Sequence, residues 1–164
     1  MSDVAREAGV TPAAVYGYFA GKEGLFEAAV DADAAALING ALDAVGGSGW
    51  LHDRWPALFV QLLADLDSHL LARRVLAGQE PEVIDRIVSL PSLLELRATV
   101  ANELAASQQA GRLRADIDPA TMAIGLESII VSLLISQLQT TIHDESRWSG
   151  VLAVLRAALA PPTT

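Results

Sequence analysis

The chain has 164 residues, a formal net charge of −9 and no cysteine, and 52% of its residues are hydrophobic. The lack of cysteine excludes disulfide bonds, thiolate catalysis, iron–sulfur clusters and cysteine redox sensing. The length allows one good core, or a small head and a larger domain. Because alanine and leucine dominate and strand formers are sparse, the composition predicts an all-helical protein.

The N-terminus lacks the basic region and apolar run of a signal peptide. The most apolar segment, residues 122–135, contains Glu127 and is shorter than the roughly 18 residues that a membrane span needs. We therefore expect a soluble cytoplasmic protein with no membrane partner. His52, His69 and His143 show no metal-ligand spacing, and we find no nucleophile–base pair or glycine-rich phosphate loop. No metal, cofactor or enzymatic activity is predicted.

The first elements along the chain are two short helices. Apolar residues recur at helical spacing over residues 3–8, and Gly9 supplies the left-handed turn that ends such a helix. Thr11 is a good N-cap, and Pro12 suits the first position of a second helix that we expect to reach about residue 19. Two short helices joined by a glycine-containing turn are the helix-turn-helix pattern, whose second helix enters the DNA major groove.

The same residues carry a family resemblance. V-A-R-E-A-G-V-T followed by V-Y-x-Y-F-x-x-K-E-x-L resembles the helix-turn-helix of tetracycline-repressor-type (TetR) transcriptional regulators, with Gly9, Tyr16, Phe19 and Lys22 at the family's spacing. An ordinary helical hairpin would explain Phe19 as a core residue, but not two tyrosines flanking a glycine with a lysine beyond them. The resemblance implies a repressor that binds a double-stranded DNA operator as a homodimer and is released by a small apolar effector.

The resemblance also assigns residues to the DNA. The implied DNA-binding residues are Thr11, Pro12, Ala13, Ala14, Tyr16, Gly17, Tyr18 and Lys22. Tyr16 and Lys22 inherit phosphate contacts. Gly17 departs from the family pattern and carries no base-reading group, so sequence readout would rest on Tyr18 and on apolar contact with thymine methyl groups. Lys22 opens the third predicted helix, where a cation opposes the helix dipole unless a phosphate docks there; a solvated surface lysine is the alternative.

The charge of this region conflicts with DNA binding. Basic patches supply most non-specific DNA affinity, yet residues 1–30 hold two basic and four acidic side chains. The resemblance begins at the family's second helix, so we expect residues 1–30 to be an incomplete three-helix head of a truncated or internally started chain that binds DNA poorly by itself. Residues 31–164 would form the effector-binding and dimerisation domain. A helical ligand-binding or dimerisation module without DNA binding remains the alternative function.

The rest of the chain reads as further helices. A third helix over residues 22–45 links the head to the body, and the glycines of residues 46–49 end it. The predicted helices of the body span residues 53–76, 82–89, 92–110, 119–142 and 146–159. The helix over residues 119–142 is apolar almost all round, so we expect it to be buried on more than one side.

Two sites are expected in the body. The middle helices are predicted to enclose an unknown small-molecule effector, although each candidate also suits a plain core. These candidates are Trp50, Trp55, Phe59, Leu62, Leu66, His69, Leu94 and Arg97. The last two helices are predicted to form a four-helix dimer interface with a second copy, as the resemblance implies, with an intramolecular core as the alternative. These candidates are Met122, Leu126, Ile130, Leu133, Leu134, Leu152 and Leu155.

Overall fold

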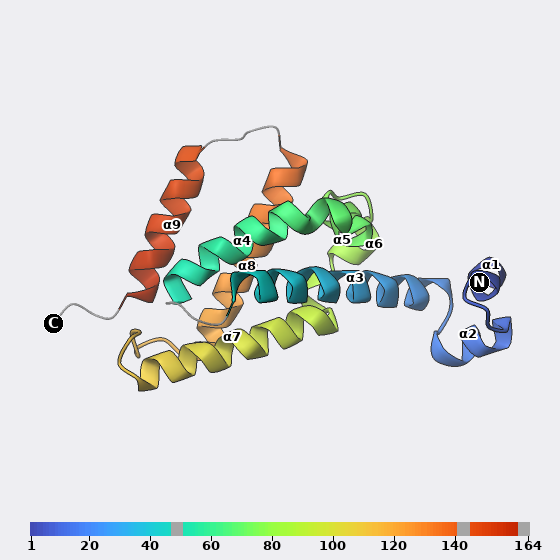
Figure 1. Ribbon diagram of the computed structural model, residues 1–164, viewed down its shortest axis with the longest axis horizontal. Coiled ribbons are helices and arrows are strands. Elements are labelled where there is room, and N and C mark those ends of the chain that lie inside the picture. The colour runs from blue at the N-terminus through green and yellow to red at the C-terminus, as the bar shows by residue number, and fades with distance from the viewer. Residues whose placement is uncertain (47–50, 141–144, 161–164) are drawn as a thin grey trace.

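The computed structural model describes residues 1–46, 51–140 and 145–160, and within these residues the fold is all-helical, as the composition predicts (Figure 1). The head consists of α1 (Ser2–Glu7) and α2 (Pro12–Tyr18). The remaining helices are α3 (Lys22–Val45), α4 (Leu51–Asp65), α5 (Leu70–Leu76), α6 (Pro81–Ile84), α7 (Pro91–Gln109), α8 (Pro119–Gln139) and α9 (Glu145–Leu159), with 3-10 turns η1 (Leu66–Ser68) and η2 (Ile87–Ser89).

Local signals fix the geometry of the head. Gly9 has a φ of +68°, and the N–H groups of Gly9 and Val10 donate to carbonyl groups of the last turn of α1, as in a Schellman motif. Thr11 caps α2, because its Oγ1 accepts a hydrogen bond of 3.2 Å from the N–H of Ala14. Ala5 and Val15 are buried between the two helices and neighbouring residues. The turn chemistry read from the sequence is therefore confirmed.

Helix α3 is the long axis of the molecule. In Figure 1 the head lies at one end of α3, and the other helices gather around the opposite part of it. Helices α4, α5 and α7 all pack against α3. Its buried residues include Val30, Leu37 and Ala41, which belong to the main core of the protein. A displacement of α3 relative to the body would therefore move the head.

Aspartates on α3 also cap two other helices. Asp33 accepts hydrogen bonds of 2.9 Å and 3.0 Å from the N–H groups of Leu71 and Ala72, in the first turn of α5. Asp31 accepts a hydrogen bond of 2.9 Å from the N–H of Ser92, in the first turn of α7. A carboxylate at a helix start satisfies free N–H groups and complements the helix dipole. These contacts hold α3 in register with α5 and α7.

Two predicted helices are divided in the structure. The helix expected over residues 53–76 ends at Asp65, and α5 begins after η1 and the non-helical His69. The polar residues near this break compete with the helix for backbone hydrogen bonds, and Asp33 of α3 stabilises the new helix start. The segment expected as one helix over residues 82–89 likewise forms α6 and η2. Both predictions of a continuous helix were wrong, because a tertiary contact and local polar groups outweigh helical periodicity.

Helix α8 is shorter and less enclosed than expected. It ends at Gln139 instead of residue 142, and residues 141–144 lie outside the described chain. Its inner face is buried, whereas Ile124 and Ser128 on its outer face are exposed. By length and apolar composition alone α8 meets the requirement for a membrane span, which corrects the expectation that this segment is too short. A core helix of a globular protein meets the same requirement, and α8 packs against α7.

Candidate DNA-binding head and effector cavity

The second helix of the head presents its polar and aromatic residues to solvent. The side chains of Tyr16 and Tyr18 are 61% and 86% exposed, and Lys22 is also exposed. Thr11, Pro12, Ala13 and Gly17 are exposed as well, and Ala14 is half-buried. All the residues that the resemblance assigned to DNA are thus on the surface or at its edge, as contact with a duplex requires.

The start of α3 is suited to an anion. Lys22 is the first residue of this helix, and Gly21, which has no side chain to cap it, stands before it with a φ of +126°. The first N–H groups of any helix lack intrahelical partners and carry a partial positive charge. The ammonium group of Lys22 and these N–H groups together form a place where a backbone phosphate is favourable.

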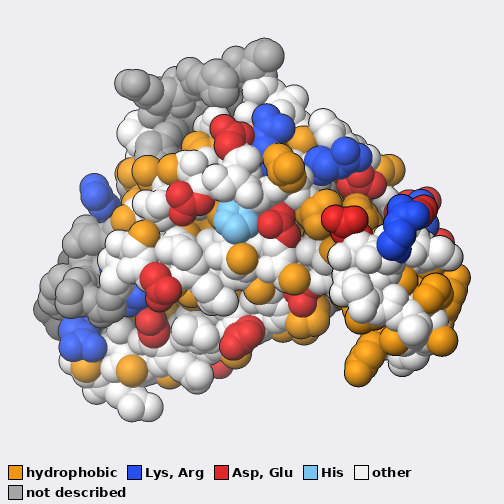
Figure 2. All heavy atoms as spheres, turned by 45° about the vertical axis from the view of Figure 1, so that its right-hand side comes forward, with side chains coloured by type: hydrophobic (Ala, Val, Ile, Leu, Met, Phe, Trp, Pro, Cys, Tyr) orange, Lys and Arg blue, Asp and Glu red, His pale blue; other side chains and the backbone are white. Residues whose placement is uncertain are grey.

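The rest of the head contributes little positive charge. Arg6, the other basic side chain of the head, forms an exposed ion pair of 3.1 Å with Asp3. Figure 2 shows acidic side chains spread over this face of the body and apolar side chains gathered at the outer edge of the head. The exposed apolar residues of the head are Val4, Val10, Tyr16 and Tyr18. The conflict between charge and DNA binding seen in the sequence therefore persists in three dimensions.

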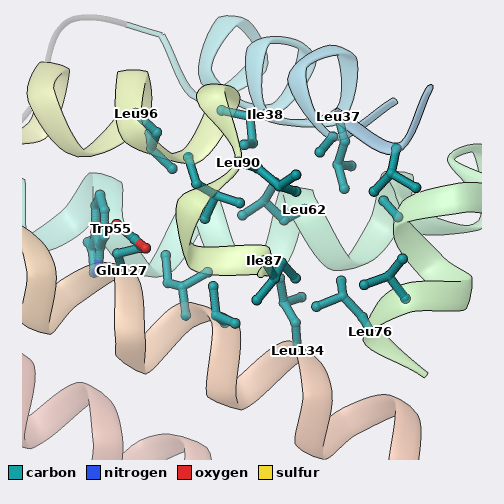
Figure 3. Close-up of a pocket in the computed structure, with 17 residues that line it drawn as sticks. Leu37, Ile38, Trp55, Leu62, Leu76, Ile87, Leu90, Leu96, Glu127 and Leu134 are labelled. Atoms are coloured by element: carbon teal, nitrogen blue, oxygen red, sulfur yellow. The ribbon is translucent and has the colours of Figure 1, made fainter. Parts of the chain in front are cut away.

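The body contains an apolar cavity between α3, α4, α5, α7 and α8 (Figure 3). The cavity volume is about 60 Å³, which is small beside the roughly 300–1,000 Å³ of drug-sized ligand sites. Four residues of α3 line it: Val30, Ala34, Leu37 and Ile38. The other lining residues are Trp55, Leu62, Ala72, Val75, Leu76, Ile87, Leu90, Leu93, Leu96, Glu127, Ile130, Val131 and Leu134.

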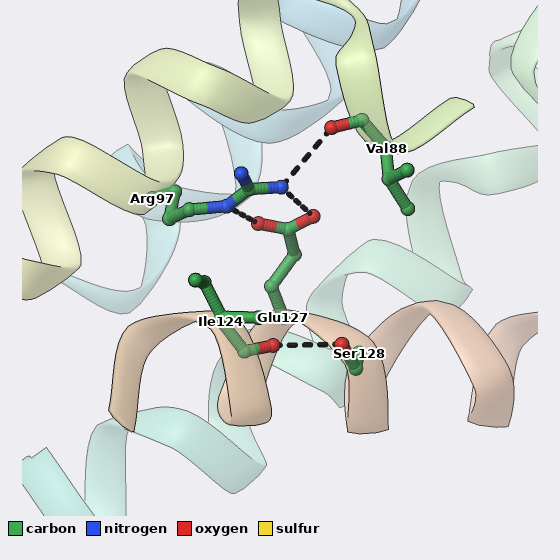
Figure 4. Close-up of polar contacts among 5 residues, drawn as sticks. All are labelled: Val88, Arg97, Ile124, Glu127 and Ser128. Atoms are coloured by element: carbon green, nitrogen blue, oxygen red, sulfur yellow. Dashed lines mark hydrogen bonds and ion pairs between the residues drawn. The ribbon is translucent and has the colours of Figure 1, made fainter. Parts of the chain in front are cut away.

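One charged residue, Glu127 of α8, stands among these lining residues. Its side chain is 4% exposed, and Arg97 of α7 binds it in a bidentate arrangement, Nε to Oε2 at 2.5 Å and Nη2 to Oε1 at 2.8 Å (Figure 4). Arg97 Nη2 also donates to the carbonyl oxygen of Val88 at 3.0 Å. The hydrogen bonds to Glu127 raise the pKa of the Arg97 guanidinium, partial burial lowers it, and the charge of Glu127 raises it again. The pair is ionic, and it joins α7 to α8.

The structure separates the residues predicted for the effector pocket. Trp55 and Leu62 line the cavity, and Arg97 does not line it but binds Glu127, which does. The other described candidates do not line it. Phe59 and Leu66 are core residues, His69 bonds to Asp33 through Nδ1 at 3.0 Å, and Leu94 is exposed. Trp50 lies outside the described residues.

The candidates for the dimer interface are also divided. Leu126, Ile130, Leu134 and Leu155 are buried in the chain's own core, and Ile130 and Leu134 line the cavity. Their side chains are covered within one chain, and their predicted contact with a second copy stays a prediction. Met122, Leu133 and Leu152 are half-buried and remain at the edge of the surface.

Several cavity residues were missed by sequence reasoning. The wall formed by α3 was read as a connector, because its alanine-rich pattern shows helical spacing but not which side meets the cavity. Glu127 had a usable signal, since an acidic residue inside an apolar helix is expensive to bury unless it has a partner. Its partner Arg97 lies 30 positions earlier in the chain, so only the fold brings them together.

A short first helix, a glycine turn and an exposed second helix ahead of a larger helical body is the arrangement seen in helix-turn-helix regulators. Residues 1–29 match the family described as bacterial regulatory proteins, tetR family. The N-terminal head therefore has the sequence signature of the TetR family of regulators, and the resemblance seen in the head is confirmed. The match covers the head, and neither a curated protein nor a solved structure matches the chain.

Proposed function

We propose that this protein is a ligand-responsive DNA-binding repressor that a small apolar effector releases from its operator. One observation carries this proposal: α3 touches both sites. Its first residue, Lys22, stands beside the recognition helix, and its residues Val30, Ala34, Leu37 and Ile38 form a wall of the cavity. In this proposal residues 1–30 are the DNA-binding head, and residues 31–164 are a cytoplasmic effector-binding and dimerisation domain without enzymatic activity.

On the DNA, Tyr16 and Lys22 contact phosphates, and α2 lies in the major groove. The exposure of both side chains and the uncapped start of α3 support these contacts. Thr11, which caps α2 through its oxygen, still has a hydroxyl proton to donate to the backbone. Tyr18 and the small residues Ala13 and Ala14 face the bases, where apolar contact favours thymine methyl groups.

The protein acts as a homodimer. One short recognition helix makes few contacts, whereas two held about 34–36 Å apart match successive turns of the major groove. The outer faces of α8 and α9 supply apolar surface for this contact, since Ile124 and Val154 are 49% and 66% exposed. An isologous interface through these helices would cover the side of α8 that one chain leaves open.

Release from DNA follows from linkage between the two sites. An effector shifts the protein only by its difference in affinity between the DNA-competent and the DNA-incompetent states. A molecule that moves the cavity wall formed by α3 changes the placement of the head, and with it the spacing of the two recognition helices. Small displacements at the cavity become larger at the far end of a long helix.

The test is a DNA-binding titration with the region upstream of the protein's own coding sequence at several salt concentrations. Lys22→Ala and Tyr16→Phe should weaken binding to all sequences alike, and Lys22→Ala should reduce the magnitude of the slope of log K against log salt by about 1. Arg112→Ala, a change of an exposed cation in the body, is the control and should have no effect.

The alternative function is a helical ligand-binding or dimerisation module that does not bind DNA. The observation that favours it is the excess of acidic over basic side chains in residues 1–30. If the titration shows no DNA binding, or binding that neither Lys22→Ala nor Tyr16→Phe weakens, the proposed DNA contacts fail, and an absence of binding makes this alternative the preferred function.

A further inference from the structure

Within the described residues, the cavity comes nearest to solvent between η2 and α8. Of the lining residues named above, Ile87 of η2 and Val131 of α8 are half-buried, whereas the others are buried. The next residues in the chain, Val88 and Ser132, are exposed. A small molecule that approaches from solvent therefore meets the lining of the cavity first at Ile87 and Val131. We call the place between these two side chains the mouth of the cavity.

Arg97 of α7 joins the two sides of this mouth (Figure 4). Its Nη2 donates to the carbonyl oxygen of Val88 at 3.0 Å, and its guanidinium also binds both carboxylate oxygens of Glu127. Val88 follows Ile87 in the chain, and Glu127 lies one turn before Val131 on the same side of α8. One side chain thus holds the backbone of η2 next to α8, directly beside the mouth.

The two sides of the mouth differ in how firmly they are packed. Helix α8 carries buried residues along its inner face, including Ala123, Ile130 and Leu134. The turn η2 has three residues, and none of them is buried. Short 3-10 turns have poorer hydrogen-bond geometry than an α-helix, and segments with few buried contacts open at a low cost in free energy. The side that can move is therefore η2, and the hydrogen bond from Arg97 to Val88 resists that movement.

We propose that small apolar molecules enter the cavity through this mouth, and that Arg97 acts as a clasp that keeps the mouth narrow. Entry breaks the hydrogen bond from Arg97 to the carbonyl oxygen of Val88, whereas the ion pair with Glu127 stays closed, so that no buried charge is left without a partner. Movement of η2 also adds space to a cavity of about 60 Å³. This inference rests on the proposed function, because it concerns access to the same cavity.

The experiment measures access to the cavity with single thiols, which the absence of cysteine from the chain makes possible. Leu134→Cys places a thiol in the cavity, and Leu104→Cys places one at a core position that does not line it. Both variants of the whole protein are treated with methyl methanethiosulfonate, a small neutral reagent, and labelling is followed by mass spectrometry. The quantity compared is the ratio of the cavity rate to the core rate. It should be well above one, and a loss of global stability alone does not raise it.

Widening the mouth should raise this ratio. Ile87→Ala removes bulk from the η2 side of the mouth, so the thiol at position 134 should react faster. The matched control is Ile84→Ala, the same truncation at a half-buried residue of α6 that does not line the cavity, and it should leave the ratio unchanged. An equal rise in both isoleucine variants, or a rise in neither, would overturn the location of the mouth.

Loosening the clasp should also raise the ratio. Arg97→Lys keeps a positive charge beside Glu127 but loses the planar fork that reaches both partners. The ratio should therefore rise roughly three- to tenfold, the worth of one hydrogen bond. Arg73→Lys, at an exposed ion pair elsewhere in the body, is the control and should have no effect. An unchanged ratio in Arg97→Lys would show that Arg97 does not restrict entry.

The unmodified mouth already tests the inference. A ratio close to one without any further substitution overturns it, because both thiols would then react only when the whole chain unfolds. If either thiol variant does not fold, Val131→Cys at the mouth and Leu126→Cys in the core replace the pair, with the same expectations. Failure of the proposed function looks different: the thiols would react as expected, but the protein would not bind DNA.

Discussion

Removing Arg97 while leaving Glu127 in place should destabilise the protein in a pH-dependent way. Arg97→Met keeps most of the aliphatic volume but strips both hydrogen bonds from a carboxylate that is 4% exposed. Breaking a buried ion pair from one side typically costs about 3–5 kcal/mol. The variant has one way to reduce that cost, which is to bind a proton at Glu127 on folding.

Protonation of Glu127 sets an upper limit on the free energy of unfolding that the variant loses by burying this charge. A glutamate in an unfolded chain has an ordinary pKa of about 4.3, and each pH unit above it adds about 1.36 kcal/mol to the cost of protonation. The limit is therefore about 3.7 kcal/mol at pH 7 and about 1 kcal/mol at pH 5. Since the folded variant then holds more protons than its unfolded chain, its stability relative to the wild type rises as the pH falls.

The assay is urea unfolding of the wild type and the variant at pH 5 and pH 7, followed by circular dichroism. At pH 7 the loss should be about 3 kcal/mol, below that limit, or roughly 10 °C in melting temperature. The control is Arg73→Met, which breaks an exposed ion pair with Asp67 and should cost less than about 1 kcal/mol at both pH values. The double variant Arg97→Met/Glu127→Leu should recover most of the stability. A loss that is the same at pH 5 and pH 7 would refute the reasoning.

Two further predictions concern the backbone and the helix caps. Gly9→Ala should destabilise the protein by about 1–3 kcal/mol, because the φ of Gly9 is +68°. Gly17→Ala should stabilise it by about 0.5–1 kcal/mol, because Gly17 lies in a helix and nothing is within 4 Å of the new methyl group. The melting temperatures of the two variants should therefore shift in opposite directions. Asp33→Ala should lower the free energy of unfolding by about 1–3 kcal/mol, because two N–H groups of α5 lose their acceptor. Hydrogen exchange at those two amides should accelerate. Unchanged protection of the amides would contradict the capping role of Asp33.

The head could be read from the sequence because its geometry depends on neighbours in the chain. Gly9, Thr11 and Pro12 act within a few residues of their own positions, through a left-handed turn, a side-chain cap and a fixed φ. The resemblance extended that reading to Tyr16 and Lys22, and the structure leaves both side chains exposed. Helical class and most helix positions in the body likewise followed from composition and apolar spacing.

The sites in the body were decided by the tertiary structure. Helical spacing shows that Ile130 and Leu134 lie on the same face of α8. Either the chain's own core or a second copy could cover that face, and the sequence does not distinguish the two. In the structure both side chains are buried in the chain's own core. The break before α5 and the pairing of Arg97 with Glu127 depend on residues more than 25 positions apart. By itself the sequence thus determined the elements whose stabilising contacts are local, and the fold determined the cavity, because only packing decides which apolar and charged side chains meet.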